Sequence, residues 1–199
     1  MVKGVVTKKE SLVFSENCSI KLGCQLESLI NIIDKKDAIT GGHSYRVALL
    51  AAKIASNLGM NKNKIEIVEI AGMVHDIGKV GVPAHILCKK GILTTNEMEM
   101  MRDHPRIGWE ILKDVSFMDK YLDGILYHHE HFDGNGYPFG LRGKEIPLIA
   151  RILSVADSYD AMTTDRPYRR AMSSEHALKE IYNQSGQQFD PYVVEALNT

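Results

Sequence analysis

The sequence predicts an all-α domain of about seven or eight helices. Apolar residues recur every three or four positions in successive segments, which is the period of a helix with one buried face. No window shows the sustained alternation of apolar and polar residues that several half-buried strands would require. Glycines, prolines and capping residues separate the periodic segments, so most predicted helix boundaries have a local chemical cause.

Length and charge restrict the class of protein further. The chain has 199 residues, of which 44% are hydrophobic and 25% charged, and a formal net charge of −1. We expect residues 21–199 to form one large domain and residues 1–20 to be an extension of unknown role. The near-zero net charge argues against a protein that binds DNA or RNA, because such proteins carry an excess of basic residues.

Cysteine content and hydropathy indicate the compartment. The three cysteines are odd in number and form no Cys-x-x-Cys pair, which favours a reducing environment. The N-terminal residues include no apolar run long enough for a signal peptide or a membrane span. We therefore expect a soluble cytoplasmic protein that does not insert into a membrane.

Glycines delimit the first two predicted helices. Residues 22–37 have apolar positions at helical spacing, and Gly41-Gly42 then break the chain. A second helix follows, which His43 opens and Gly59 closes. On this segment alone His43 is best explained as a polar residue facing water, so a role as a ligand depends on the other candidate residues.

The third predicted helix ends in the most informative stretch of the chain. Asn63 is expected to cap this helix, and its apolar positions continue to Val74. His75 and Asp76 follow; adjacent helical residues point about 100° apart, so this pair suits two metal ions, or one ion at a helix end. Lys79 lies four residues beyond His75, on the same face, where it could hold an anion beside the metals.

Start signals define the next helices. Residues 81–91 are predicted to be a loop. Thr94 with Glu97 three residues later is the pattern of a capping box at the start of a short helix. Pro105 suits the first turn of a helix over residues 105–113.

A predicted helix over residues 118–127 leads into two histidines and a long loop. His128 and His129 stand at the end of that helix, before residues 130–147, which are rich in glycine and proline. Long loops in compact domains tend to be functional or disordered. The position of the two histidines therefore favours a ligand role.

The most apolar predicted helix carries two aspartates. Residues 149–162 form this helix, and the run that precedes Asp157 would bury its carboxylate. Burying an unpaired charge costs several kcal/mol, whereas a bound metal would supply the missing positive charge. Asp160 follows three residues later.

Capping residues predict the last two helices. Ser173 or Ser174 begins the first of them, which ends near Gly186. Asp190 followed by Pro191 gives the cap-then-proline order that opens the second.

Five histidines and two aspartates are the candidate metal ligands. Each one alone has an ordinary explanation, as a core histidine bonded to a carbonyl, a cap or a solvated helix end. Together they suffice for two six-coordinate ions if one carboxylate bridges and water completes the coordination. Cysteine is absent from the set, so a structural zinc cage is not expected, and first-row ions such as Fe, Mn or Zn fit these donors. The candidates are His43, His75, Asp76, His104, His128, His129 and Asp157.

Six motifs over about residues 37–170 carry a family resemblance. They are His43-Ser44-x-Arg46-Val47, His75-Asp76-Ile77-Gly78-Lys79, His104-Pro105-x-x-Gly108, His128-His129-Glu130-x-x-Asp133-Gly134-x-Gly136-Tyr137-Pro138, Ala150-Arg151-Ile152-Leu153-x-Val155-Ala156-Asp157-x-Tyr159-Asp160-Ala161-Met162-Thr163, and Arg166-Pro167-Tyr168-Arg169. With these motifs the sequence resembles the HD-GYP family, a subgroup of the HD-domain metal-dependent phosphohydrolases. The resemblance implies an HD-domain-like helical bundle with a long glycine-rich loop named after Gly136-Tyr137-Pro138.

The resemblance also implies an activity and a set of site residues. The activity is that of a phosphodiesterase that opens cyclic di-GMP, a bacterial second messenger, to linear pGpG by attack of a metal-bridging hydroxide; some members continue to GMP. One metal would lie among His43, His75, Asp76 and Asp157, and the second among His104, His128 and His129, with Asp76 bridging. The substrate-binding residues implied are Lys79, Tyr137, Asp160, Arg166 and Arg169; Asp76 and Lys79 would be catalytic.

One departure from the family pattern bears on the number of metals. Some members have a glutamate four residues before the first histidine, which supports a third ion, but this sequence has Ile39 there. Asp37 is nearby, yet six residues before His43 it would need unusual backbone geometry. We therefore expect two divalent ions, with Fe or Mn preferred and Zn or Ni as alternatives, and accumulation of pGpG with little GMP.

Three other functions stay open at this stage. The first is hydrolysis of another cyclic dinucleotide or phosphate ester on the same fold. The second is a non-catalytic module that senses cyclic di-GMP or docks on diguanylate cyclase (GGDEF) domains. The third is a helical domain whose histidines have only structural roles. The sequence also leaves open whether the chain forms a homodimer.

Overall fold

The computed structural model describes residues 42–165 and 170–197, and within these ranges the chain is helical. The described residues contain no β-strand, and their only β-type pairing is a single bridge between Ser185 and Phe189. The predicted all-α class is therefore confirmed. Several predictions lie outside the described residues: the extension 1–20, the helix over 22–37, Asp37, Ile39, Arg166 and Arg169.

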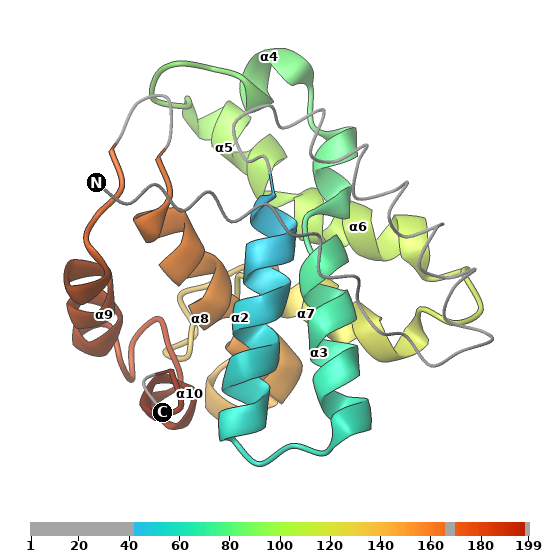
Figure 1. Ribbon diagram of the computed structural model, residues 1–199. Helices are drawn as coiled ribbons and strands as arrows, with labels where there is room; N and C mark the ends of the chain where they lie inside the picture. Colours follow the sequence, from blue (N-terminus) through green and yellow to red (C-terminus); the bar gives the residue numbers. More distant parts are fainter. Residues whose placement is uncertain (1–41, 166–169, 198–199) are drawn as a thin grey trace, which may run out of the picture.

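Nine α-helices and three short 3₁₀ helices make up the described chain (Figure 1). They are α2 (His43–Asn57), α3 (Lys62–Val74), η1 (Ile77–Gly81), α4 (Ala84–Leu87), α5 (Thr95–Arg102), α6 (His104–Leu112), η2 (Asp119–Tyr121), α7 (Leu122–Tyr127), η3 (Gly143–Glu145), α8 (Leu148–Thr163), α9 (Ser174–Asn183) and α10 (Pro191–Glu195). None of them has the length and apolar character needed to cross a membrane, within the residues described.

The α2–α3 hairpin forms one side of the core. The two helices lie side by side in Figure 1, and α2 also packs against α8, while α6 packs against η1 and α7. Small residues permit the close approach: a Cβ on Gly72 would lie 2.9 Å from the Cα of Ala48. Ala48, Ala51 and Ala55 are fully buried on the α2 face. The core therefore fixes the ends of α2, α3 and α8 relative to one another.

Most predicted helix starts are confirmed, with one correction. Thr94 and Glu97 form a reciprocal capping box, as predicted. The cap of α3 is Asn61 rather than Asn63: the Asn61 side chain accepts the Lys64 backbone N–H at 3.0 Å. Asn61 has the extended backbone (φ −71°, ψ 162°) that an N-cap requires, whereas Asn63 is already inside the helix.

Three boundaries differ from the prediction in detail. The stretch 81–91 includes the short helix α4, because Ile86 and Leu87 pack into a small apolar cluster. The predicted helix over 118–127 is divided into η2 and α7. The helix that begins at the Ser173 cap ends at Asn183, before Gly186.

Candidate metal centre

Ends of helices bring the seven predicted ligands together. His43 is the first residue of α2, His75 and Asp76 follow α3, His104 begins α6, and His128 and His129 follow α7. Asp157 alone comes from the middle of a helix, α8. Gly42, with φ +77°, makes the left-handed turn that starts α2 at His43. Helices distant in sequence thus direct their donors to one region.

A glycine contact sets the approach of Asp76 to His104. After α3 the chain leaves the helical conformation at Asp76 (φ −95°, ψ 8°) and enters η1. In η1, a Cβ on Gly78 would lie 1.8 Å from the carbonyl oxygen of His104 and 2.5 Å from the Gly108 nitrogen. Only glycine permits this contact between η1 and the first turn of α6.

Asp76 lies at the centre of the donor set. Its Oδ2 is 3.3 Å from His75 Nε2 and 3.7 Å from His43 Nε2. Its Oδ1 is 3.3 Å from His104 Nε2, on the other side. A further carboxylate, Asp157, places Oδ1 3.1 Å from His43 Nε2. The two Asp76 oxygens therefore face different histidines, as a bridging ligand would require.

Hydrogen bonds to main-chain carbonyls fix the orientation of three imidazoles. The Nδ1 atoms of His75, His104 and His128 lie 2.7, 2.8 and 2.8 Å from the carbonyl oxygen three residues earlier in the chain. A carbonyl oxygen can only accept, so each Nδ1 carries a proton, and in the neutral imidazole each Nε2 then retains its lone pair. This is the tautomer that binds a metal through Nε2.

The positions of the Nε2 atoms suit a cation placed between them. His104 Nε2 and His128 Nε2 face each other at 3.3 Å, although the Nδ1 bonds leave both as acceptors. His75 Nε2 is buried and has no hydrogen-bond partner among the described residues. A buried polar atom without a partner is costly. The residues present therefore fit a bound metal ion.

Three groups of donors are close enough to share an ion. In each group the ligand atoms lie within 4.8 Å of one another. The groups are His43 with His75 and Asp157, His104 with His128 and His129, and His75 with Asp76 and His128. The first two groups contain the residues of the two sets implied by the family resemblance, except Asp76, which lies between the groups. Their role as metal ligands stays a prediction.

The protonation states suit metal ligands. Burial and the neighbouring His129 hold the pKa of His128 well below its usual value. Burial and His104 lower the pKa of His129 to about 3. Burial opposes the charged form of Asp76, but His75 and Lys79 hold its pKa well below the usual range. These histidines are therefore neutral and this carboxylate is ionised, as coordination requires.

Around His43, the carboxylates of Asp157 and Asp160 favour a positive charge. Burial disfavours its imidazolium, yet the hydrogen bonds to Asp157 and Asp160 raise its pKa to about 10. Burial also opposes ionisation of Asp157, and the hydrogen bond from His43 holds the Asp157 pKa below its usual value. A metal ion can supply the charge that this proton supplies in its absence.

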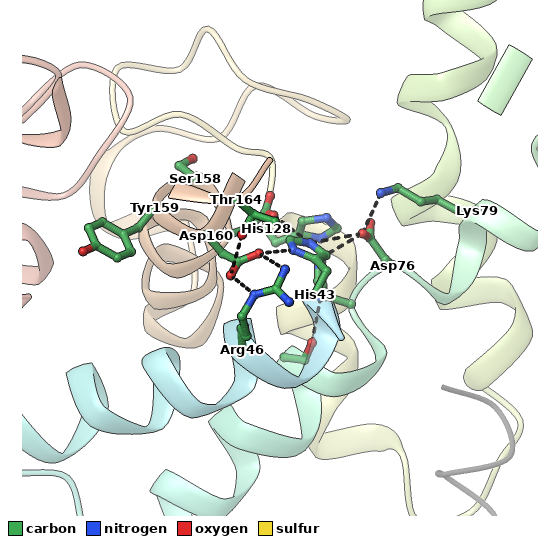
Figure 2. A network of polar contacts seen from close by, with 12 residues as sticks. His43, Arg46, Asp76, Lys79, His128, Ser158, Tyr159, Asp160 and Thr164 are labelled. Atoms are coloured by element: carbon green, nitrogen blue, oxygen red, sulfur yellow. Dashed lines mark hydrogen bonds and ion pairs between the residues drawn. The ribbon is translucent and has the colours of Figure 1, made fainter. Parts of the chain in front are cut away.

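A second layer of polar contacts holds His43. Its Nδ1 lies 2.6 Å from Asp160 Oδ2, and Arg46 contacts both Asp160 oxygens, with Nε at 2.5 Å and a terminal nitrogen at 3.0 Å (Figure 2). Asp160, expected from the resemblance to bind substrate, is buried and engaged by these two side chains. Its placement favours a role in orienting His43 over a role in binding substrate. Arg46 was not among the predicted site residues, although it lies three residues after His43 in the first motif.

Lys79 and Tyr137 border the donor set. Lys79 Nζ lies 2.6 Å from Asp76 Oδ2 (Figure 2), and 19% of its side chain is exposed. The Tyr137 ring stacks on His129, with centroids 4.8 Å apart and an interplanar angle of 26°. Arg102, which lies outside the six motifs, holds its guanidinium 5.4 Å from the Tyr137 ring centroid.

The fold and the donor set define a helical domain in which donors from separate helices could hold metal ions. The chain belongs to the HD-domain family, because the family model described as "HD domain" matches residues 27–193. This finding confirms the family expected from the six motifs.

Known relatives are phosphodiesterases. The cyclic di-GMP phosphodiesterase response regulator RpfG of Xanthomonas campestris pv. campestris is 41% identical over 174 residues, which cover 86% of this chain and 46% of that protein. A cyclic di-GMP phosphodiesterase of Thermotoga maritima is 42% identical over 173 residues, which cover 86% of this chain and 47% of that protein. The chain therefore spans about half the length of these relatives.

A solved structure shares the fold. The crystal structure of the cyclic GMP-AMP specific phosphodiesterase V-cGAP3 of Vibrio cholerae matches with a TM-score of 0.66 at 21% identity. The match covers 86% of this chain and 47% of that chain. At this identity the likeness concerns the fold alone.

Proposed function

We propose that this domain hydrolyses cyclic di-GMP to linear pGpG with the help of bound metal ions. The observation that carries the proposal is the convergence of buried Nε2 atoms around Asp76. The activity named for RpfG and for the Thermotoga protein supports cyclic di-GMP as the substrate.

Two divalent ions are proposed, held in the two histidine groups with Asp76 between them. His43, His75 and Asp157 would hold one ion, and His104, His128 and His129 the other. Nitrogen and oxygen donors without thiolate suit Fe or Mn, with Zn or Ni as alternatives. When bound, such ions stabilise charge on phosphate oxygens and lower the pKa of water, which makes a nucleophile available at neutral pH.

The protein side chains supply charge and orientation. Asp76 contributes a fixed negative charge between the two donor groups. Lys79 lies beside Asp76 and its side chain is partly exposed, so it can face a phosphate that enters the site. Tyr137 covers His129 on the loop side and would limit where the substrate lies. Contacts of Arg166 and Arg169 with the phosphates remain predictions.

Lys79→Ala should slow turnover without removing metal. Lys79 contributes charge stabilisation rather than coordination, so we expect kcat to fall roughly 10²–10³-fold, the usual effect of losing one transition-state donor. Elemental analysis should give the same metal content as the wild type. A parallel fall in metal content and activity would contradict this role.

Asp160→Asn should weaken metal binding. The amide retains the shape of the carboxylate but loses the charge that orients His43, and loss of such a partner typically costs about 10–100-fold in metal affinity. Metal titration of the apo variant measures this effect directly. If metal affinity stays unchanged while KM for cyclic di-GMP rises, Asp160 contacts substrate, as first expected from the resemblance.

A substrate panel tests the proposed activity. Protein purified without oxygen, with its metal content measured, should be incubated with cyclic di-GMP, 3′3′-cyclic GMP-AMP and cyclic di-AMP. We expect the highest kcat/KM with cyclic di-GMP and accumulation of pGpG with little GMP. A preference for cyclic GMP-AMP would favour hydrolysis of another cyclic dinucleotide, which is motivated by the 3′3′-cGAMP-specific phosphodiesterase 3 of Vibrio cholerae, 36% identical over 176 residues. Tight binding of cyclic di-GMP without turnover by metal-loaded protein would contradict hydrolysis and favour a sensing module.

Three further expectations remain predictions about the whole protein. They are a cytoplasmic location, docking on diguanylate cyclase (GGDEF) domains and formation of a homodimer. Size-exclusion chromatography coupled to light scattering would decide the last of these.

A further inference from the structure

Glu130 is a buried carboxylate without a part in the proposed chemistry. It follows directly after His128 and His129, and it is 2% exposed. Burying a carboxylate is costly unless its oxygens accept hydrogen bonds. The question is therefore what its two oxygens bind.

Both oxygens of Glu130 bind the same stretch of loop. Oε1 accepts the backbone N–H of Phe139 at 2.7 Å, and Oε2 accepts that of Leu141 at 3.0 Å. The backbone N–H of Tyr137 donates to the carbonyl oxygen of His129 at 3.1 Å. We call residues 137–141 the return segment. Two consecutive residues, His129 and Glu130, thus accept hydrogen bonds from every second backbone N–H of this segment.

The residue before the return segment, Gly136, also packs tightly against the backbone that follows the two histidines. A Cβ on Gly136 would lie 2.1 Å from the His131 nitrogen and 2.5 Å from the Glu130 Cα, so the loop lies directly against this backbone. The Tyr137 ring that follows stacks on the His129 ring. The positions of the return segment and of the Tyr137 ring therefore depend on the backbone of residues 129–131.

We propose that Glu130 is a positioning residue that holds the return segment so that Tyr137 lies over His129 beside the substrate. The inference rests on the proposed function and extends it, because it assigns Glu130 to substrate binding through Tyr137. The oxygens of Glu130 bind backbone N–H groups of the return segment rather than the candidate metal ligands. Loss of these two hydrogen bonds displaces Tyr137 while leaving the metal ligands in place.

The cavity beside the return segment provides a local reporter. Phe139 lines a cavity of about 590 Å³ together with Trp109, which is the only tryptophan of the chain. Acrylamide quenching of tryptophan fluorescence therefore reports displacement of the return segment without any assay of activity.

Glu130→Gln is the main test, because it keeps the side-chain volume but turns an NH₂ group toward one of the two backbone donors. We expect KM for cyclic di-GMP to rise roughly tenfold, the equivalent of about 1.4 kcal/mol, with kcat within about twofold of wild type. Metal equivalents per chain should be unchanged, and quenching of Trp109 should increase. Glu145→Gln is the matched control: Glu145 is exposed and accepts the backbone N–H of Arg142 at 2.9 Å in the same loop.

Each outcome decides the assignment. A KM for Glu130→Gln no higher than that of Glu145→Gln overturns it, and so does a loss of metal in proportion to activity. Tyr137→Ala tests the same step without disturbing the buried carboxylate: it should raise KM by a similar factor, and an unchanged KM overturns the role of the ring. In the Tyr137→Ala background, Glu130→Gln should raise KM no further; independent effects would contradict action through Tyr137.

Failure of the proposed function is distinguishable from failure of this inference. If the metal-loaded wild type does not hydrolyse cyclic di-GMP, the proposed function fails. Comparing the acrylamide quenching of Trp109 fluorescence in Glu130→Gln with that in Glu145→Gln still decides whether Glu130 holds the return segment.

Discussion

Asp76→Ala should release bound metal and reduce hydrolysis of cyclic di-GMP below detection. Asp76 presents one oxygen to His75 and the other to His104, so its removal takes the shared negative charge from both donor groups at once. Like-charged ions at close range require an anion between them. Metal content should therefore fall in both groups, and activity should fall with it. Elemental analysis and a product assay on the same preparation measure both effects.

A control variant separates this effect from loss of the fold. Asp119→Ala removes an exposed aspartate at the start of η2, outside the donor set, and should retain metal and activity. In Asp76→Ala, Lys79 loses the carboxylate that it contacts at 2.6 Å, but its side chain is partly exposed and can turn toward water. Far-UV circular dichroism should therefore resemble that of the wild type. Retention of two metal equivalents per chain in Asp76→Ala would contradict the bridging position.

Gly78→Ala should damage both the fold and the metal centre. The added Cβ would lie 1.8 Å from the His104 carbonyl oxygen, a backbone atom that cannot move without shifting the start of α6. Steric conflict of this kind belongs with the most destabilising substitutions, and we expect a loss of more than about 4 kcal/mol in the free energy of unfolding. Denaturant unfolding and metal analysis should both show large losses.

Gly91→Ala is the matched control for this substitution. Nothing lies within 4 Å of the position that its Cβ would occupy, so stability should change little, within about 0.5 kcal/mol. Equal stability of Gly78→Ala and Gly91→Ala would mean that η1 and α6 do not meet as described, and that Asp76 approaches His104 by another route.

Local signals in the sequence account for most helix boundaries. The Thr94–Glu97 capping box and the Asp190 cap involve residues within three positions of each other, so they can be recognised without knowledge of the fold. The error at Asn63 has the same origin: two asparagines stand two positions apart, and only the backbone conformation at Asn61 distinguishes the cap.

The composition of the donor set and, through the family resemblance, its division into two groups could be predicted, but the helix packing that brings the donors together could not. Helical periodicity places histidines at helix ends without specifying which ends meet. The contact between His43 and Asp160 joins residues 117 positions apart, and it follows from the packing of α2 on α8. The same holds for Gly78, whose contact with His104 depends on how η1 lies against α6. The proposed roles of Arg46 and Glu130 could therefore be inferred only from the structure.

Anomalous scattering from crystals of protein purified without oxygen tests the metal centre most directly. Data collected at the iron and manganese absorption edges should give two peaks per chain, one among His43, His75 and Asp157 and one among His104, His128 and His129. Asp76 should lie between them, and a third peak near Asp37 is not expected because Ile39 cannot coordinate. A single peak, no peak within the donor set, or a third fully occupied peak near Asp37 would contradict the proposed two-metal centre.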